Sequence, residues 1–399
     1  MPVTEVRAST EHFLGMPVSR FLREFWQKQA LLIRQAFPGY VAPLTPEDLA
    51  GLACEEAALS RLVTYKRKQD QWQLRTGPFA ESEFPKLGKK DWTLLVQDMD
   101  KWDSDVRALL DRFRFLPAWR VDDIMISFAT PGGSVGPHVD QYDVFLLQAQ
   151  GHRRWQVDAS PNPPGAFRSD AELKLLEKFD ASDEWVLAPG DILYLPPGVP
   201  HHGEAVDACM TFSIGMRAPS QAELIVDLAE ELAARLPEEA RYADPDLVEP
   251  SEPFEIDEAA FARVDQALSA LQSIGAGQKR EWFGRFITRY RAAGEVSAGP
   301  RVPSLAGAVA SLAKGGLLLR HPFSRAAWAA DGPGKSGNAL LFVSGESFRM
   351  DRRSAHVLAS YDALDDAALA KLDDAGRVAL GELLQRGHYH LKRASRSRG

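Results

Sequence analysis

The sequence has few cysteines, no long apolar run and no excess of positive charge. Only two of its 399 residues are cysteines, Cys54 and Cys209, which excludes an extracellular scaffold built on disulfides. No segment approaches the roughly 18 consecutive apolar residues of a membrane-spanning helix. Residues 1–15 also lack the charged and then apolar pattern of a signal peptide. These absences predict a cytoplasmic protein that makes no contact with membranes.

The balance of charge is acidic. The chain has 47 Lys and Arg against 55 Asp and Glu, which gives a net charge of -8. Because proteins that bind nucleic acids usually carry a basic surface, we expect no direct nucleic-acid binding. A chain of this length is predicted to form two or three domains.

The distribution of residue types predicts an α+β protein. Up to residue 219, short apolar runs alternate with Gly, Pro and Asp, which is typical of a β-barrel or a double-sheet jelly roll. The runs that predict strands lie at residues 120–130, 143–150, 152–158, 183–188, 191–196 and 209–216. Helical patterns precede them at residues 19–32, 44–53 and 102–113.

After residue 219 the pattern changes to helices and then to a smaller module. Ser220 and Glu223 form a capping box for a helix with Leu224, Leu228 and Leu232 along one face. Further helices are predicted at residues 261–271, 282–291 and 375–387, and a hairpin at residues 338–350. Helix, hairpin and helix in this order suit a winged-helix-like module. We therefore expect domains at residues 1–219, 220–299 and 300–399.

Two motifs in the β-rich part carry candidate metal ligands. In His138-Val139-Asp140 the one-residue gap points both side chains to the same face of an extended strand. Alone, such a pair is as well explained by an ion pair at a barrel rim. The second motif, GDILYLPPGVPHHG at residues 190–203, describes a strand, a Pro-Gly turn and a histidine that enters the next strand. In a jelly roll this turn brings His201 opposite the first motif.

His202 competes with His201 as the distal ligand. The spacing selects His201, and the period of two turns His202 to the other face of the strand. Two imidazoles and one carboxylate are the facial triad of non-haem Fe(II) oxygenases. A zinc or manganese cupin with isomerase or hydrolase activity is the alternative, although the chain lacks the glutamate expected shortly after the first motif.

Arg153 is a candidate for holding an anionic co-substrate. In GHRRWQVD, residues 151–158, Arg153 shares a face with Trp155 and Val157, and this apolar face should look into the barrel. An arginine there is costly unless something negative meets it. Its guanidinium is suited to a carboxylate. The alternative is an ion pair with a buried Asp or Glu.

These segments together resemble a known family. Residues 122–157, 188–203 and 213–219 are similar to the JmjC-type 2-oxoglutarate oxygenases, and specifically to the bacterial ribosomal oxygenases. The resemblance implies a JmjC jelly roll (double-stranded β-helix), a helical dimerisation region and a winged-helix-like C-terminal domain. It also implies hydroxylation of an arginine of a large-subunit ribosomal protein, number sixteen of that subunit, by a homodimer.

The resemblance assigns residue roles as well. His138, Asp140 and His201 match the iron ligands, through which catalysis proceeds, with Fe(II), 2-oxoglutarate and O2 as cofactor and co-substrates. Arg153 matches the residue that holds the distal carboxylate of 2-oxoglutarate, and Ser127 matches a supporting hydroxyl, although a hydrogen-bonded core serine explains Ser127 equally well. Candidate substrate contacts are Gln141, Tyr142, Asp143 and Ser213.

Three other functions remain open from the sequence. The same metal site suits a hydroxylase of a ribosomal-protein histidine or a lysine demethylase. The metal cupin is more remote. The third is a non-catalytic binding module that contacts nucleic acid through its winged-helix-like end, against which the acidic composition argues.

Overall fold

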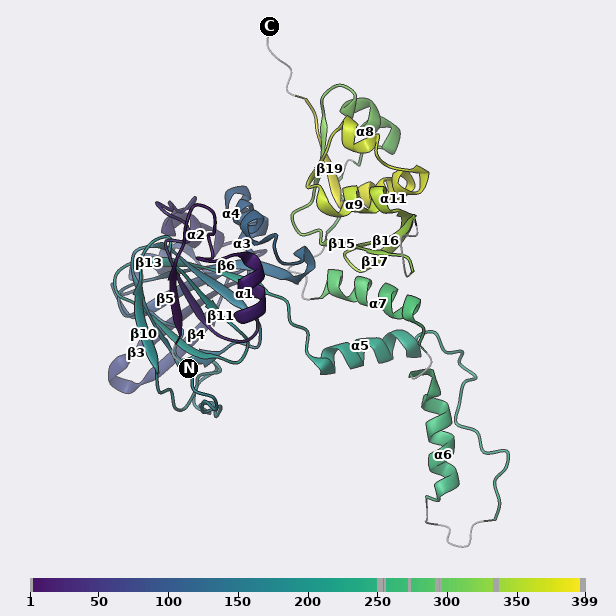
Figure 1. Ribbon diagram of the computed structural model, residues 1–399, viewed down its shortest axis with the longest axis horizontal. Coiled ribbons are helices and arrows are strands. Elements are labelled where there is room, and N and C mark those ends of the chain that lie inside the picture. The colour runs from purple at the N-terminus through teal and green to yellow at the C-terminus, as the bar shows by residue number, and fades with distance from the viewer. Residues whose placement is uncertain are drawn as a thin grey trace. The chain divides into compact units, whose positions relative to one another are not determined.

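The chain forms two compact units, Met1–Ala218 and Pro219–Gly399 (Figure 1). The computed structural model describes residues 3–249, 254, 256–271, 274–290, 294, 296–300, 302–332 and 337–394. None of the helices in these ranges is both long enough and apolar enough to cross a membrane. The division into three domains at residues 219 and 299 stays a prediction.

The first unit is a sandwich of two β-sheets. In hydrogen-bonding order, the major sheet contains β1 (Thr4–Arg7), β2 (Leu31–Arg34), β11 (Ile192–Leu195), β8 (Val144–Gln150), β13 (Cys209–Met216), β6 (Val121–Ala129), β5 (Trp92–Val96), β3 (Ser60–Lys66) and β4 (Gln71–Thr76). The minor sheet contains β10 (Asp183–Leu187), β9 (Arg153–Val157), β12 (Pro200–Ala205) and β7 (His138–Val139). This arrangement confirms the predicted jelly roll.

Helices cover the outer face of the major sheet. They are α1 (Val18–Glu24), α2 (Pro46–Leu52), α3 (Met99–Trp102) and α4 (Ser104–Ala108), with the short 3-10 helix η3 (Leu109–Phe113). The other 3-10 helices of this unit are η1 (Arg67–Gln69), between β3 and β4, η2 (Glu81–Lys86) and η4 (Ala118–Arg120). Phe21 of α1, Leu49 of α2 and Val106 of α4 join Phe145 and Phe212 of the sheet in one buried core. Burying each such side chain stabilises the fold by about 1.5–3 kcal/mol.

A second core lies between the two sheets. Val144 and Leu146 of β8 and Leu193 of β11 face Trp155 and Val157 of β9 there. Strand β8 is therefore buried on both faces, which explains its unbroken apolar sequence VFLL.

Six predicted strands are confirmed, but in this unit the helix predicted at residues 19–32 is wrong in its extent. The run at residues 19–32 is helical only as far as Glu24. Gln27 then adopts a left-handed conformation with φ of 56°, and its N–H donates to the hydroxyl of Tyr194. Residues Leu31–Arg34 form β2 instead, because they pair with both β1 and β11.

The second unit combines helices with two small sheets. Its helices are α5 (Gln221–Ala233), α6 (Glu258–Ala267), η5 (Leu268–Leu271), α7 (Ala276–Arg289), α8 (Leu305–Leu312), α9 (Arg352–Ser360), α10 (Asp366–Leu369) and α11 (Asp374–Gln385). Its strands are β14 (Leu317–Arg320), β15 (Ala326–Ala330), β16 (Asn338–Val343), β17 (Glu346–Asp351), β18 (Ala363–Leu364) and β19 (Tyr389–Lys392).

The predicted local features of this unit are largely confirmed. Ser220 and Glu223 form the capping box of α5. β16 and β17 form the predicted hairpin around Ser344 and Gly345, which both have positive φ. The predicted helix at residues 282–291 begins earlier, at Ala276, and residue 291 lies outside the described part of the chain. Gly284 of α7 lets this helix approach the ring of Phe342 in β16, because a Cβ there would lie 2.3 Å from the ring.

Candidate metal centre

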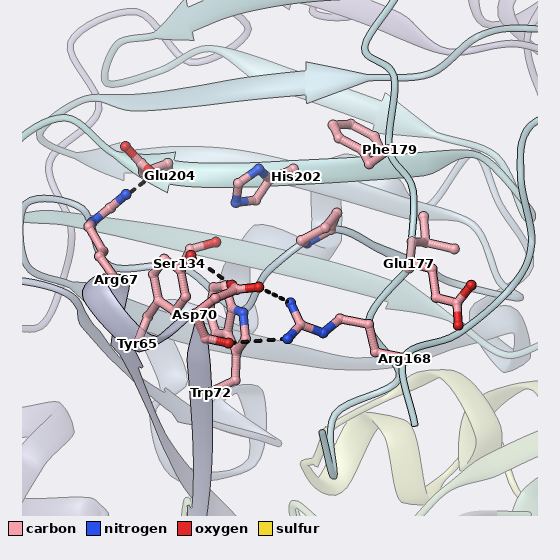
Figure 2. A pocket seen from close by; sticks show the side chains of 12 residues that line it. Tyr65, Arg67, Asp70, Trp72, Ser134, Arg168, Glu177, Phe179, His202 and Glu204 are labelled. Carbon is pink, nitrogen blue, oxygen red and sulfur yellow. Dashed lines mark hydrogen bonds and ion pairs between the residues drawn. The ribbon is translucent and has the colours of Figure 1, made fainter. Parts of the chain in front are cut away.

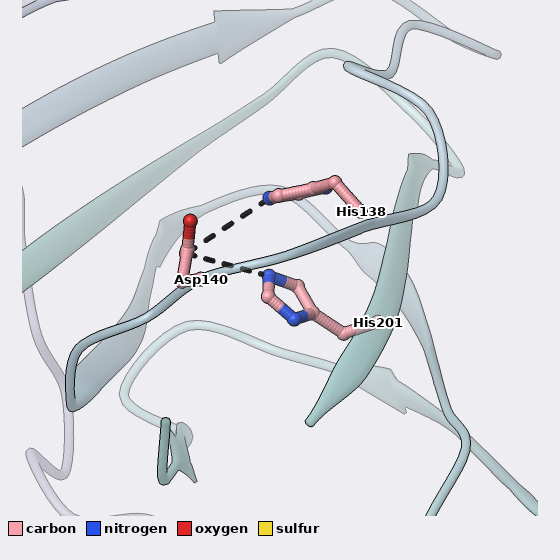
Figure 3. Close-up of side chains that lie close together, drawn as sticks. All are labelled: His138, Asp140 and His201. Carbon is pink, nitrogen blue, oxygen red and sulfur yellow. Dashed lines mark ion pairs between the residues drawn. The ribbon is translucent and has the colours of Figure 1, made fainter. Parts of the chain in front are cut away.

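Three side chains converge at the edge of the minor sheet, as Figure 3 shows. His138 of β7 and His201 of β12 are direct antiparallel partners, so both side chains leave the same face of the sheet. Asp140 follows His138 by two residues and points to the same side. The two motifs predicted from the sequence therefore meet in space.

The distances within this cluster suit a single metal ion. The Oδ2 atom of Asp140 lies 4.0 Å from Nε2 of His138 and 3.7 Å from Nε2 of His201. The two imidazole rings are 4.2 Å apart between centroids. All three ligand atoms lie within 4.8 Å of one another. Atoms that each lie about 2.1 Å from one ion are at most about 4.2 Å apart, so only small side-chain movements would let these three atoms share an ion.

Backbone carbonyls orient both imidazoles toward the cluster. Nδ1–H of His138 donates to the carbonyl of Gly136, and Nδ1–H of His201 donates to that of Val199, each at 2.9 Å. Each Nε2 then keeps a lone pair for a metal. Burial, and next the proximity of His138, lowers the pKa of His201 to about 4, so this imidazole is neutral at physiological pH.

His202 points to the other face of β12. Its ring packs edge-on against Phe179 at 6.1 Å, on the outer side of the minor sheet. Burial lowers the pKa of His202 to about 4 as well. Adjacent histidines on one strand thus occupy two different environments, of which only that of His201 contains Asp140.

Arg153 is buried inside the barrel without an anionic partner. Its side chain is 3% exposed, and one Nη donates to the carbonyl of Gly203 at 3.1 Å. Nε and the other Nη are buried and have no hydrogen-bond partner. Among the residues that the structure describes, no carboxylate lies within ion-pair distance of this guanidinium. Burial lowers the pKa of Arg153, because the charged form of the guanidinium is unfavourable where water is excluded.

Small and polar residues surround the guanidinium of Arg153. The thiol of Cys209 on β13 contacts the guanidinium. Thr211 lies two residues after Cys209 on β13 and on the same face of the strand. Ser127 of β6 is the cross-strand partner of Thr211. Gly203 permits this packing, because a Cβ would lie 2.6 Å from Nε of Arg153. The hydroxyl of Ser127 donates a long hydrogen bond of 3.5 Å to the carbonyl of Thr211.

A second polar cluster lies toward the start of β6. Tyr142 approaches the carboxylates of Asp140 and Asp123, and burial, together with these charges, raises the pKa of its hydroxyl. Burial, and next the like charge of Asp98, raises the pKa of Asp123 to about 7. Asp123 accepts a hydrogen bond from the N–H of Asp98. The nearby Lys101 is bound by Asp98 and Asp100 instead.

The sequence did not lead us to Asp123, although a signal for it was present. Asp123, Met125 and Ser127 alternate with the core residues Ile124 and Ile126 along β6. The same period of two that selected Arg153 therefore places a carboxylate on the inner face.

The other three predicted substrate contacts, Ser213, Gln141 and Asp143, differ in burial and in hydrogen bonding. Ser213 is buried on the inner face of β13, opposite Met125. Gln141 is exposed. The carboxylate of Asp143 is fully buried and accepts hydrogen bonds from Tyr194, Gln27 and Arg120. Because all of these donors belong to the fold, Asp143 is occupied as a structural acceptor.

Comparisons with known families agree with this geometry. A family model of the JmjC domain matches residues 108–224, and one of the ROXA-like winged helix matches residues 278–390. A model of the AraC-like ligand binding domain matches residues 179–272 and so overlaps the first from residue 179 to residue 224.

Two curated bacterial proteins are similar in sequence. The ribosomal protein uL16 3-hydroxylase of Escherichia coli (strain K12) is 38% identical over 289 residues, which cover 70% of this chain and 74% of that protein. A probable ribosomal oxygenase of Haemophilus influenzae is 40% identical over 230 residues, covering 57% of this chain and 54% of that protein.

Solved structures extend the similarity to nearly the whole chain. The X-ray structure of E. coli YcfD has a TM-score of 0.80 and 33% identity, and covers 95% of this chain and 99% of that one. The structure of the ribosomal oxygenase YcfD in complex with cobalt and 2-oxoglutarate has a TM-score of 0.77 at 32% identity, with coverage of 95% and 99%. From the sequence identity, the shared fold and the matching domain models together, this chain belongs to the bacterial ribosomal oxygenase family of JmjC proteins.

Proposed function

We propose that this protein is an Fe(II)- and 2-oxoglutarate-dependent oxygenase that hydroxylates an arginine side chain of the large-subunit ribosomal protein uL16. The observation that carries this proposal is Arg153. A buried guanidinium with two unpaired nitrogens is unstable unless a ligand supplies the missing charge. A dicarboxylate bound by the neighbouring metal centre would present its far carboxylate to such a group.

The metal-binding residues fit Fe(II). Two imidazoles and one carboxylate are the donor set of non-haem Fe(II) oxygenases, and no thiolate is present to favour zinc among the three grouped ligands. A relative in the same family has been solved with cobalt, a divalent ion with similar ligand preferences, and with 2-oxoglutarate. Bound iron would activate O2 with oxidation of 2-oxoglutarate to succinate and CO2, and deliver one oxygen atom to a substrate carbon.

The chain's own residues would position the two organic partners. His138, Asp140 and His201 hold the metal, Arg153 fixes the distal carboxylate of 2-oxoglutarate, and Ser127 donates a further hydrogen bond to it. Buried Trp155 packs beside Arg153, whose guanidinium lies 5.1 Å from the centroid of the Trp155 ring. Exclusion of water there strengthens the charge-assisted bonds.

Asp123 and Tyr142 support an arginine as the substrate side chain. A guanidinium offers five N–H donors and a flat cationic face. Asp123 supplies a carboxylate without a cationic partner among the described residues, and Tyr142 supplies an aromatic ring and a hydroxyl close to Asp140. Ser213 lies on the same inner surface as a further hydrogen-bonding group. Gln141 remains a proposed contact at the exposed rim.

The test is succinate formation from 2-oxoglutarate by the purified protein with Fe(II), with and without uL16, followed by mass spectrometry of uL16. We expect turnover stimulated by uL16 and the gain of one oxygen atom on an arginine. Oxygen on a histidine, or loss of methyl carbon from a lysine, would show that a residue other than arginine is the substrate. Tightly held zinc together with absence of turnover would reject the proposed oxygenase reaction.

We also propose that the protein acts as a homodimer through its helical segment. Ile225 and Val226 of α5 and Phe261 of α6 are between 52% and 67% exposed, whereas Leu224, Leu228 and Leu232 are partly buried. Large exposed apolar side chains on neighbouring helices are typical of an interface. Ile225→Glu combined with Val226→Glu should convert the dimer to a monomer in light scattering, whereas an unchanged mass would reject this interface.

The remaining proposals concern location and domain limits. A ribosomal protein as substrate and the acidic composition support a cytoplasmic enzyme that binds the free protein rather than nucleic acid. The proposed division is an oxygenase domain at residues 1–219, a helical region at 220–299 and a winged-helix-like domain at 300–399.

A further inference from the structure

A cavity lies on the outer face of the minor sheet, as Figure 2 shows. Its volume is about 270 Å³. Its walls come from β3 and β4, from the segment before β7, from the long connection between β9 and β10, and from β12. The cavity is therefore built by segments far apart in the sequence, and all of them belong to the first unit.

This cavity is distinct from the metal centre but adjoins it. Pro137, which lines the cavity, directly precedes His138, and His202 directly follows His201. Successive strand residues are about 3.3 Å apart and point to opposite faces. The two sites therefore lie on opposite faces of the minor sheet, close to its edge strand β7, and a polypeptide that passes around this edge could reach both.

Aromatic rings form two sides of the cavity. Tyr65 and Trp72 stack with ring centroids 4.1 Å apart and an interplanar angle of 15°. Phe179 faces them from the connection between β9 and β10, and it packs edge-on against His202. Aromatic faces of this kind attract organic cations and pack against their alkyl chains.

The two arginines in the wall are already neutralised. Arg67 is bound by Asp91 at 2.6 Å and by Glu204 at 3.0 Å. Arg168 is bound by Asp70 and Asp170, each at 2.8 Å. Each guanidinium is held by two carboxylates, so neither is available to attract an anion.

Further groups favour a cation. Glu177 at the rim is exposed and forms no ion pair with any of the described residues. The cavity and its direct partners therefore have an excess of negative charge. Nε2 of His202 is buried beside the cavity and has no hydrogen-bond partner in the described part of the chain.

We propose that this cavity binds the side chain of a second lysine or arginine of the protein substrate, near the arginine that is hydroxylated. The proposal rests on the proposed function, because it assumes a basic protein segment at the metal centre. Aromatic walls, excess carboxylates and an unpaired imidazole nitrogen match a side chain with an apolar stem and a cationic, hydrogen-bonding end. The cavity would set which basic segment is accepted.

The first test uses Glu177→Gln and Phe179→Ala, with Glu172→Gln as the matched control. Glu172 is exposed on the same connection but does not line the cavity. We expect each cavity variant to raise KM for uL16 about three- to tenfold, with kcat and the KM for 2-oxoglutarate unchanged. The control should match the wild type. Raised salt should diminish the effect of Glu177→Gln.

The second test identifies the occupant with uL16 peptides in which each lysine or arginine other than the hydroxylated one is replaced by glutamine. One replacement should raise the Kd of the peptide for the wild-type protein, measured by fluorescence anisotropy. The same replacement should raise the Kd for the Glu177→Gln variant only slightly above the value of the unchanged peptide with that variant. Strictly additive losses for every peptide, or cavity variants that match the wild type, would overturn the proposal. Failure of the wild type to hydroxylate uL16 at all would instead reject the enzymatic function on which it rests.

Discussion

The two faces of strands β6 and β13 differ in composition and in what they do. On the outer face, Ile126 and Phe212 are fully buried against the helical layer. On the inner face, Asp123, Ser127 and Ser213 are polar and have few partners within the fold. The outer face therefore supplies stability, whereas the inner face holds polar groups for ligands at a cost to stability.

The largest expected effect is on the inner side, at the metal centre. Asp140→Ala removes one of three ligands and should lower turnover by more than about 100-fold, since even outer-sphere partners of a metal change activity by roughly 10- to 100-fold. The melting temperature of the metal-free protein should stay close to that of the wild type, because Asp140 is 24% exposed and outside the core. Metal content and succinate release are the measurements, and turnover near the wild-type rate would remove Asp140 from the ligand set.

The comparison between faces is most direct at two adjacent residues of β13. Phe212 is fully buried in the outer core, so Phe212→Ala should cost about 3–5 kcal/mol of unfolding free energy. Ser213→Ala, on the inner face, should change it by less than about 1 kcal/mol while raising KM for uL16. Denaturant unfolding and steady-state kinetics measure both. Equal losses of stability in the two variants would contradict the division between faces.

Asp123→Asn should increase stability in a pH-dependent way. The carboxyl titrates near 4 in an unfolded chain and at about 7 in the folded protein. Between these values only the unfolded chain carries the charge, so rising pH destabilises the wild type, and the full cost is present above about pH 7. Asn keeps an acceptor for the N–H of Asp98 but has no charge to bury. The variant should therefore gain about 1–3 kcal/mol over the wild type at pH 8 and little near pH 4.

The same substitution should weaken substrate binding. Without a carboxylate at position 123 the guanidinium of the substrate loses a charge-assisted partner, so KM for uL16 should rise. For the wild type, affinity for uL16 should increase as pH rises through about 7, where Asp123 ionises. A flat pH profile of affinity in the wild type, or a variant that is less stable at pH 8, would assign Asp123 to the fold instead.

The alternation of side chains made much of the barrel and of the site predictable. A period of two selected His201 over His202 and Arg153 over Arg154, and the structure shows His201 facing Asp140 and Arg153 buried. This works because β9 and β12 are regular strands with an unbroken register. The same rule would have found Asp123.

The rule fails where the strand ends. Residues 140–143 lie outside regular strand structure, so the alternation did not predict that Asp143 turns into the network with Tyr194. Strands β1 to β5 were missed. The pairing of β2 depends on distant partners, since it lies between β1 and β11, whereas β3 and β4 pair with each other as a local hairpin. In addition, the sequence of Leu31–Arg34 fits the last turn of a helix as well as it fits a strand.

The most direct test of the division between faces is Arg153→Met, assayed for both 2-oxoglutarate affinity and stability. Met keeps the length and much of the packing volume of arginine but carries no charge. If Arg153 is held for a ligand, the affinity for 2-oxoglutarate should fall at least about 30-fold. The unfolding free energy without 2-oxoglutarate should rise by about 1 kcal/mol or more. Unchanged affinity together with lower stability would show that Arg153 serves the fold, and would contradict the proposed co-substrate site.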